Sequence, residues 1–116
     1  MKVGIVSREK EGPVGKAVEL VAKTLTKYQF ERFSQTEFQP KYIPEKSLDA
    51  VIFEGSSAQD EGFATAIKRH VSVPVFYLAY GKVQTQLDGI EIYHVVEQGQ
   101  EKNFIQLIAR LTEVLK

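Results

Sequence analysis

Apolar and polar positions along this chain follow two periods in turn, which indicates strands separated by helices. Short apolar runs without alternation are typical of strands covered on both faces, and apolar residues three or four positions apart are typical of helices packed on one side. These patterns predict five strands, over Lys2–Val6, Tyr28–Phe33, Asp49–Phe53, Val73–Leu78 and Ile90–Val96. They predict helices over Pro13–Lys27, Asp60–His70 and Asn103–Leu115, and Asp60 is expected to cap the second of these. The second strand is expected to be half exposed near an edge of the sheet. The last helix is expected to face inward with Phe104, Leu107, Ile108, Leu111 and Leu115.

The second and fourth connections between strands do not allow full helices. Pro40 and Pro44 each remove a backbone donor and disfavour helix in the preceding residue, so residues 34–47 are expected to be irregular with about one turn. Gly81–Gly89 is short and polar, which limits a helix there to about two turns. The alternation of strands and helices therefore predicts a three-layer α/β/α sandwich around a five-stranded parallel sheet, with shortened second and fourth helices.

Length and composition predict one domain over residues 1–116, soluble and cytoplasmic. A chain of 116 residues can bury a core without disulfides, and this one contains no cysteine. Fifteen Lys and Arg residues balance fifteen Asp and Glu residues, so no overall positive charge favours direct binding of nucleic acid or of an anionic membrane. No apolar run approaches the roughly 18 residues of a membrane span, and the N-terminal run is too short for a signal peptide.

In a parallel sheet of this kind, ligands bind beyond the carboxyl ends of the strands, where loops 7–11, 54–57, 79–82 and 97–100 are expected. None of these loops contains a complete catalytic, cofactor or metal motif. Gly12–Ala17 resembles the end of a phosphate-binding loop, but Lys10 stands in place of its first glycine. His70 and His94 lack the spacing of metal ligands. No catalytic, cofactor-binding or metal-binding residue is therefore assigned, and no cofactor is expected.

One spacing connects this pattern to a known family. Asp49 opens the third predicted strand, and Glu54, five residues later, directly follows it. Together with the order of the elements over nearly the whole chain, this spacing resembles the receiver domain of two-component response regulators. In that family an acidic residue often opens the third strand and a phosphoacceptor aspartate ends it. The resemblance implies a flavodoxin-like, receiver-like topology.

The other functional positions of a receiver fall on residues that depart from the receiver pattern. The two acids that would hold Mg²⁺ fall on Ser7 and Arg8, the hydroxyl residue after the fourth strand falls on Ala79, and the fifth-strand lysine falls on or near Val96. Phosphoryl transfer to a carboxylate needs a divalent ion, a cation and a hydroxyl group around the phosphoryl oxygens. The matched positions supply none of the three.

The resemblance therefore implies a pseudo-receiver, a non-catalytic regulatory module of signal transduction that lacks the phosphorylation site. Its degenerate phosphoacceptor pocket would be formed by Ser7, Arg8, Glu54, Ala79 and Val96. Arg8 and Glu54 are expected to form an ion pair there that imitates an occupied pocket. Both residues can equally be solvated loop charges.

A protein-binding surface is expected near the fifth strand. A shortened fourth helix would leave the sheet edge uncovered there, and tyrosines suit interfaces because each combines an apolar ring with a polar tip. The candidate surface consists of Tyr80, Lys82, Tyr93 and His94, together with Tyr77, and the partner is an unidentified protein or a second copy of the chain. Tyr93 also stands at the place of the fifth-strand aromatic residue of receivers. These tyrosines can equally pack beneath the chain's own helices.

Two alternatives stay open. A small flavodoxin-like protein or enzyme can bind an anionic ligand at the loops of Ser7, Glu54–Ser57 and Gly81, where the Gly55-Ser56-Ser57 turn offers backbone N–H groups. The chain can also be one domain of a larger assembly.

Overall fold

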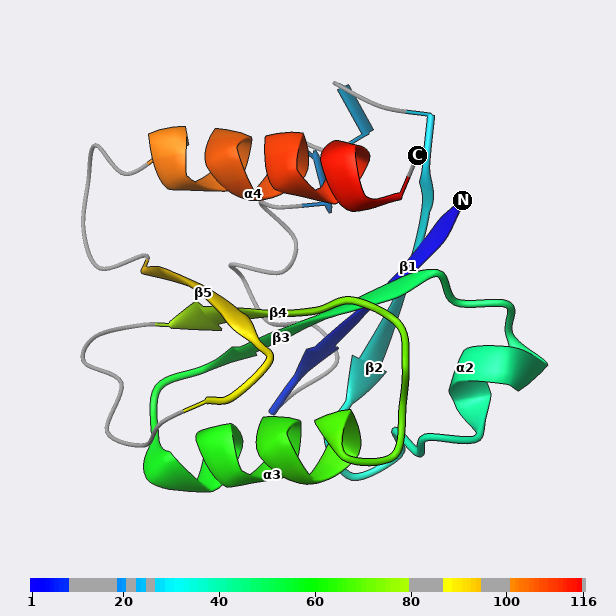
Figure 1. The fold of residues 1–116 in the computed structure, drawn as a ribbon, viewed down its shortest axis with the longest axis vertical. Helices are drawn as coiled ribbons and strands as arrows, with labels where there is room; N and C mark the ends of the chain where they lie inside the picture. The colour runs from blue at the N-terminus through cyan, green and yellow to red at the C-terminus, as the bar shows by residue number, and fades with distance from the viewer. Residues whose placement is uncertain (9–18, 21–22, 25–26, 80–86, 95–100, 116) are drawn as a thin grey trace.

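In the computed structural model, shown in Figure 1, the described residues are 1–8, 19–20, 23–24, 27–79, 87–94 and 101–115. They form a parallel five-stranded sheet with strand order β2-β1-β3-β4-β5. The strands are β1 (Lys2–Ser7), β2 (Gln29–Ser34), β3 (Ala50–Gly55), β4 (Val75–Ala79) and β5 (Glu91–His94), and the helices are α2 (Tyr42–Glu45), α3 (Ala58–Lys68) and α4 (Glu101–Val114). The predicted fold class is confirmed.

Side-chain alternation along the strands creates two cores, one on each face of the sheet. On one face, Val51 and Phe53 of β3 pack in a buried cluster with Ala64 and Ile67 of α3 and Ile43 of α2. On the other face, strand residues such as Ile5, Ile52 and Phe76 pack with Leu107, Ile108, Leu111 and Leu115 of α4. Figure 1 shows α3 and α4 on opposite sides of the sheet. The inward face predicted for the last helix is confirmed for those four leucine and isoleucine residues; the Phe104 side chain lies outside the described part.

The two edge strands differ in how far they match the predicted bounds. β2 lies at one end of the sheet and is only partly buried, as expected for a half-exposed edge strand. β5 lies at the other end and is described as Glu91–His94, while residues 95 and 96 lie outside the described ranges.

β4 begins at Val75, after Pro74, because proline cannot donate to a ladder. The Pro74 carbonyl still accepts the Val51 amide at 3.1 Å.

The second connection contains a single turn of helix, as the prolines predict. α2 has four residues, and Pro44 is its third, in the first turn, where its missing N–H breaks no helical hydrogen bond. The Phe33 ring holds this turn against the sheet, with ring centroids 5.1 Å from Phe38 and 5.9 Å from Tyr42. The fourth connection, at residues 80–86, lies outside the described residues.

Part of the first predicted helix is also described. Within Pro13–Lys27, residues 19–20 and 23–24 are helical, Lys27 lies beyond the helix, and residues 13–18, 21–22 and 25–26 lie outside the described ranges. Within the described parts of the chain, no helix is long and apolar enough to cross a membrane.

Candidate functional site

Ser7 and Glu54, two residues of the predicted pocket, lie at the carboxyl ends of neighbouring strands. β1 and β3 pair in parallel with Val3 opposite Ala50 and Ile5 opposite Ile52, so Ser7 follows in register beside Glu54. Because side chains alternate along a strand, Ser7 and Glu54 share the face that α4 covers. Both are buried, with 3% of Ser7 and 4% of Glu54 exposed.

Arg8 makes its contacts with α3 and not with Glu54, so the expected Arg8–Glu54 ion pair is wrong. Arg8 comes one residue after Ser7, and the alternation therefore places it on the opposite face, with Val6 and α3. Its Nη2 atom lies 2.9 Å from Oδ2 of Asp60 and 3.1 Å from Oγ of Ser57. The Arg8 side chain is 62% exposed, whereas that of Asp60 is 2% exposed.

The Asp60 carboxylate is the centre of this end of the sheet. Four donors approach its Oδ2 atom: Nη2 of Arg8 at 2.9 Å, the Ser56 amide at 2.9 Å, the Ser57 amide at 3.2 Å and the Ser57 hydroxyl at 3.0 Å. Nε2 of Gln35 donates to Oδ1 at 2.8 Å. These donors come from the end of β1, the segment after β2 and the loop between β3 and α3. One carboxylate therefore connects three segments through hydrogen bonds.

Asp60 also belongs to the capping box of α3. Ser57 is the N-cap residue, and its hydroxyl accepts the Asp60 amide at 3.2 Å while the Asp60 side chain accepts the Ser57 amide. The helix therefore begins at Ala58, and the prediction that Asp60 is the N-cap is wrong by three residues. The Ser-x-x-Asp spacing of residues 57–60 is the signal by which the sequence could have revealed this box.

The electrostatics keep the Asp60 carboxyl ionised. Burial alone would raise its pKa, but hydrogen bonds from the Ser56 amide, Gln35, Ser57 and Arg8 outweigh this effect and hold the pKa below its ordinary value. Asp60 thus acts as a fixed negative charge at the positive end of α3.

The buried hydroxyl of Tyr77 lies next to this cluster. Tyr77 is on β4, is 1% exposed, and its hydroxyl has no hydrogen-bond partner among the described residues. A Cβ atom added to Gly55 would lie 2.5 Å from this hydroxyl and 2.8 Å from Cγ of Asp60. The two polar groups thus approach each other across the Gly55 backbone, and burial, followed by the charges of Asp60 and Glu61, raises the pKa of Tyr77. The sequence reasoning missed Gln35, Asp60 and Tyr77 as members of this site.

The remaining predicted positions are dispersed. Ala79 ends β4 and is 3% exposed. Tyr93 is half-buried, with its ring 6.4 Å from that of Phe76, and burial raises its pKa. His94 is exposed at the end of β5. Tyr80, Lys82 and Val96 lie outside the described residues.

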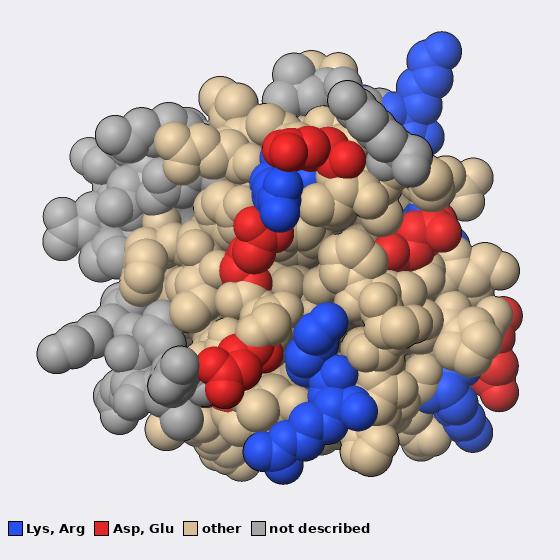
Figure 2. All heavy atoms as spheres, viewed as in Figure 1, with Lys and Arg blue, Asp and Glu red and all other residues tan. Residues whose placement is uncertain are grey.

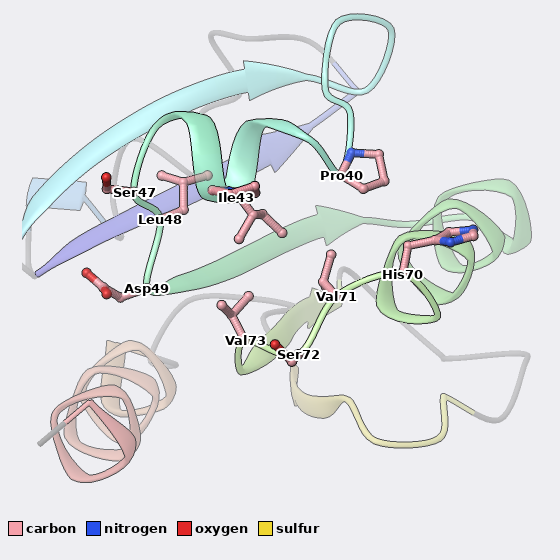
Figure 3. A pocket seen from close by; sticks show the side chains of 10 residues that line it. Pro40, Ile43, Ser47, Leu48, Asp49, His70, Val71, Ser72 and Val73 are labelled. Carbon is pink, nitrogen blue, oxygen red and sulfur yellow. The ribbon is translucent and has the colours of Figure 1, made fainter.

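A separate hollow of about 430 Å³ lies at the opposite, amino end of the strands. Its walls come from α2, from the residues before β3 and from the residues before β4; they are Pro40, Ile43, Pro44, Ser47, Leu48, Asp49, His70, Val71, Ser72 and Val73. Figure 3 shows the apolar side chains of Ile43 and Val71 pointing toward each other across it. Of its lining residues, Asp49 accepts a hydrogen bond from the Lys2 amide at 2.8 Å.

Surface charges are mixed in sign. On the face shown in Figure 2, acidic and basic side chains lie in small neighbouring groups among uncharged ones. Arg110 pairs with Glu91 at 2.9 Å and Glu113 at 3.1 Å, and Glu31 pairs with Lys2 and Lys46. Among the described residues, no three His, Asp or Glu side chains gather in a group that could hold a metal ion.

Solved structures of other proteins share this fold. No protein-family model and no curated protein matches the sequence. The lysine decarboxylase LdcF of Francisella novicida is similar over 98% of this chain, at a TM-score of 0.61 and 14% identity, but the chain spans only 17% of the decarboxylase. A fragment of a protein described as a lipoprotein from Peptoclostridium difficile 630 is similar at a TM-score of 0.59 and 11% identity, over 99% of this chain and 98% of the fragment.

The third similar structure is the N-terminal domain of the nisin resistance regulator NsrR, a lantibiotic response regulator. It is similar at a TM-score of 0.57 and 13% identity, over 99% of this chain and 97% of that domain. All three identities are low, so these similarities establish the fold: a flavodoxin-like α/β sandwich that a response-regulator domain also adopts.

Proposed function

We propose that this chain is a non-catalytic regulatory domain, built like a receiver but without its phosphorylation chemistry, that acts by binding another protein. The support is twofold. The fold is shared with the N-terminal domain of a response regulator. The residues at the carboxyl edge differ in chemistry from those that phosphoryl transfer to an aspartate requires.

The observation that carries this proposal is the ion pair between Arg8 and Asp60. Arg8 stands where a receiver has a metal-binding acid, and its guanidinium is held 2.9 Å from a buried carboxylate. A fixed cation at this place repels Mg²⁺, and Asp60 already satisfies the donors of the loop after β3. Glu54, at the place of the phosphoacceptor, is 4% exposed on the other face of the sheet.

The proposed partner surface lies along β5, the last strand of the sheet. The residues predicted for this surface are Tyr93 and His94 of β5 and, earlier in the sequence, Tyr80 and Lys82. An edge strand offers backbone groups to a partner, and half-buried tyrosines add apolar contact area. Either a different protein or a second copy of the chain fits this description.

The test is a titration with Mg²⁺ and beryllofluoride, which mimics a phosphoryl group on a carboxylate. We expect no saturable change in the NMR amide signals of Gly55, Ser56 and Ser57 and no rise in Tm beyond that with Mg²⁺ or fluoride alone. A ligand that bound only the folded state would stabilise it by RT ln(1 + [L]/Kd), so binding would be visible in both readouts. Saturable binding that needs Mg²⁺ and beryllofluoride together would overturn the non-catalytic assignment, whereas binding of an anion without Mg²⁺ would not.

A further inference from the structure

The donors around Asp60 have the arrangement of an oxyanion site. Nη2 of Arg8, two backbone amides and the Ser57 hydroxyl all point to one oxygen, and Gln35 donates to the other. The amides belong to Ser57, the N-cap residue of the eleven-residue helix α3, and to Ser56 just before it, where the helix dipole favours negative charge. This is a set of convergent donors with an anion in its centre, and the anion is a side chain of the protein itself.

A carboxylate is a poor geometric match for this set. Each carboxylate oxygen has about two acceptor positions, and Oδ2 of Asp60 is approached by four donors while Oδ1 receives one. The Tyr77 hydroxyl, 1% exposed and without a hydrogen-bond partner in the described part of the chain, lies next to the same carboxyl group. A tetrahedral oxyanion has four oxygens to share among these donors and can also accept from Tyr77.

We infer that the loop after β3 forms a binding site for a phosphate group, and that the Asp60 carboxylate occupies it as a tethered competitor. Binding of the phosphate group and closure of the α3 capping box exclude each other, because both use the Ser57 amide, and the Ser56 amide donates to the same oxygen of Asp60. Displacement of Asp60 thereby couples the ligand to the start of α3. This inference does not depend on the proposed regulatory role, because a phosphate site at this loop is compatible with other functions.

The first test removes the competitor and supplies inorganic phosphate. Asp60→Ala is titrated with phosphate against chloride at equal ionic strength, and Tm and the amide signals of Ser56 and Ser57 are followed. We expect saturable stabilisation, with an affinity at least about tenfold higher than that of the unsubstituted chain, in which Asp60 must first be displaced. If Asp60→Ala is unfolded in chloride, the recovery of the far-UV circular dichroism with phosphate gives the same affinity.

The matched control is Asp88→Ala, which removes an exposed acid away from the site. It reports the general stabilisation that phosphate gives to any folded protein. If Asp60→Ala gains no more than Asp88→Ala, the oxyanion site is overturned. If the unsubstituted chain binds phosphate as tightly as Asp60→Ala, Asp60 is not a competitor and the inference fails.

The role of Tyr77 separates a tetrahedral anion from a planar one. In Asp60→Ala/Tyr77→Phe, phosphate affinity is expected to fall by about tenfold or more, because a hydrogen bond to a charged group is lost, while the effect of formate stays unchanged. Equal losses for both anions would overturn the assignment to phosphate. A parallel titration with O-phosphoserine distinguishes free phosphate from a phosphoryl group carried on a side chain, according to which of the two binds more tightly.

Discussion

At the scale of single residues, the Tyr77 hydroxyl is a buried donor whose removal is expected to stabilise the protein. It is 1% exposed and has no partner among the described residues. A buried polar group without a hydrogen bond costs about 1–3 kcal/mol, so Tyr77→Phe is expected to raise the free energy of unfolding by about 1 kcal/mol or more. Urea denaturation measures this change.

The comparison for this prediction is Tyr42→Phe, at a half-buried tyrosine of α2. A substitution there is expected to stay within about 0.5 kcal/mol of the unsubstituted chain. A loss of stability in Tyr77→Phe would show that the hydroxyl already has a partner in the folded protein. A gain would indicate that the chain keeps a destabilising group at this end of the sheet.

Two glycines of the same region are expected to respond to alanine in opposite directions. A Cβ on Gly55 would lie 2.5 Å from the Tyr77 hydroxyl and 2.8 Å from Cγ of Asp60, whereas a Cβ on Gly62 would meet no atom within 4 Å. Gly55→Ala is therefore expected to destabilise by about 1–3 kcal/mol through overpacking. Gly62→Ala, within α3, is expected to stabilise by about 0.5–1 kcal/mol through helix propensity.

Both glycine variants are compared by urea denaturation under the same conditions. Gly62→Ala adds a methyl group in open space within α3, whereas Gly55→Ala adds one at the end of β3 against Asp60 and Tyr77. Equal changes in the free energy of unfolding would mean that Asp60 and Tyr77 move away from the methyl group of Gly55→Ala at no cost.

At the scale of elements, the start of α3 is expected to make stability depend on pH. Because the folded-state pKa of Asp60 lies below its ordinary value, the contribution of this carboxylate is complete above the unfolded pKa, about 3.9. It is lost as the pH falls through the lower, folded pKa. The stability difference between the unsubstituted chain and Asp60→Asn is therefore expected to be constant near neutral pH and to shrink below about pH 4.

Urea denaturation at a series of pH values measures this difference, with Asp88→Asn as the variant at an exposed acid. The difference in the free energy of unfolding between the unsubstituted chain and Asp88→Asn should stay small at every pH. A difference for Asp60 that stays the same down to low pH would contradict the assignment of Asp60 as the ionised centre of the capping box.

The elements were predictable from the sequence because their determinants are local. The two prolines before β3 limited α2 to one turn, and the unbroken apolar run of β3 indicated burial on both faces. The start of α3 was misplaced because Ser57 and Asp60 are both good capping residues, and the choice between them depends on which side chain the other segments approach. Gln35 and Arg8 donate to Asp60 from outside the helix.

At the scale of the whole molecule, the order of strands and helices was enough to predict the sheet and its class, but not the candidate site. Arg8 and Asp60 are 52 positions apart, so their contact depends on strand register and on the face to which each side chain points. The same alternation places Arg8 and Glu54 on opposite faces of the sheet, although their neighbouring loops had predicted an ion pair between them. Tyr77 looked like an interface residue, and only its place beside β3 shows that it is buried.

The parallel order of the sheet also affects how a new chain is made. β1 lies between β2 and β3, and the bond from the Lys2 amide to the Asp49 side chain joins residues 47 apart. At a synthesis rate of about 5–20 residues per second, one edge of β1 waits about 2–10 s for its second neighbour to be translated. During that interval its apolar side chains are exposed beside an open strand edge. The open edge of β1 is therefore the place where we expect nascent chains to associate with one another before β3 has been made.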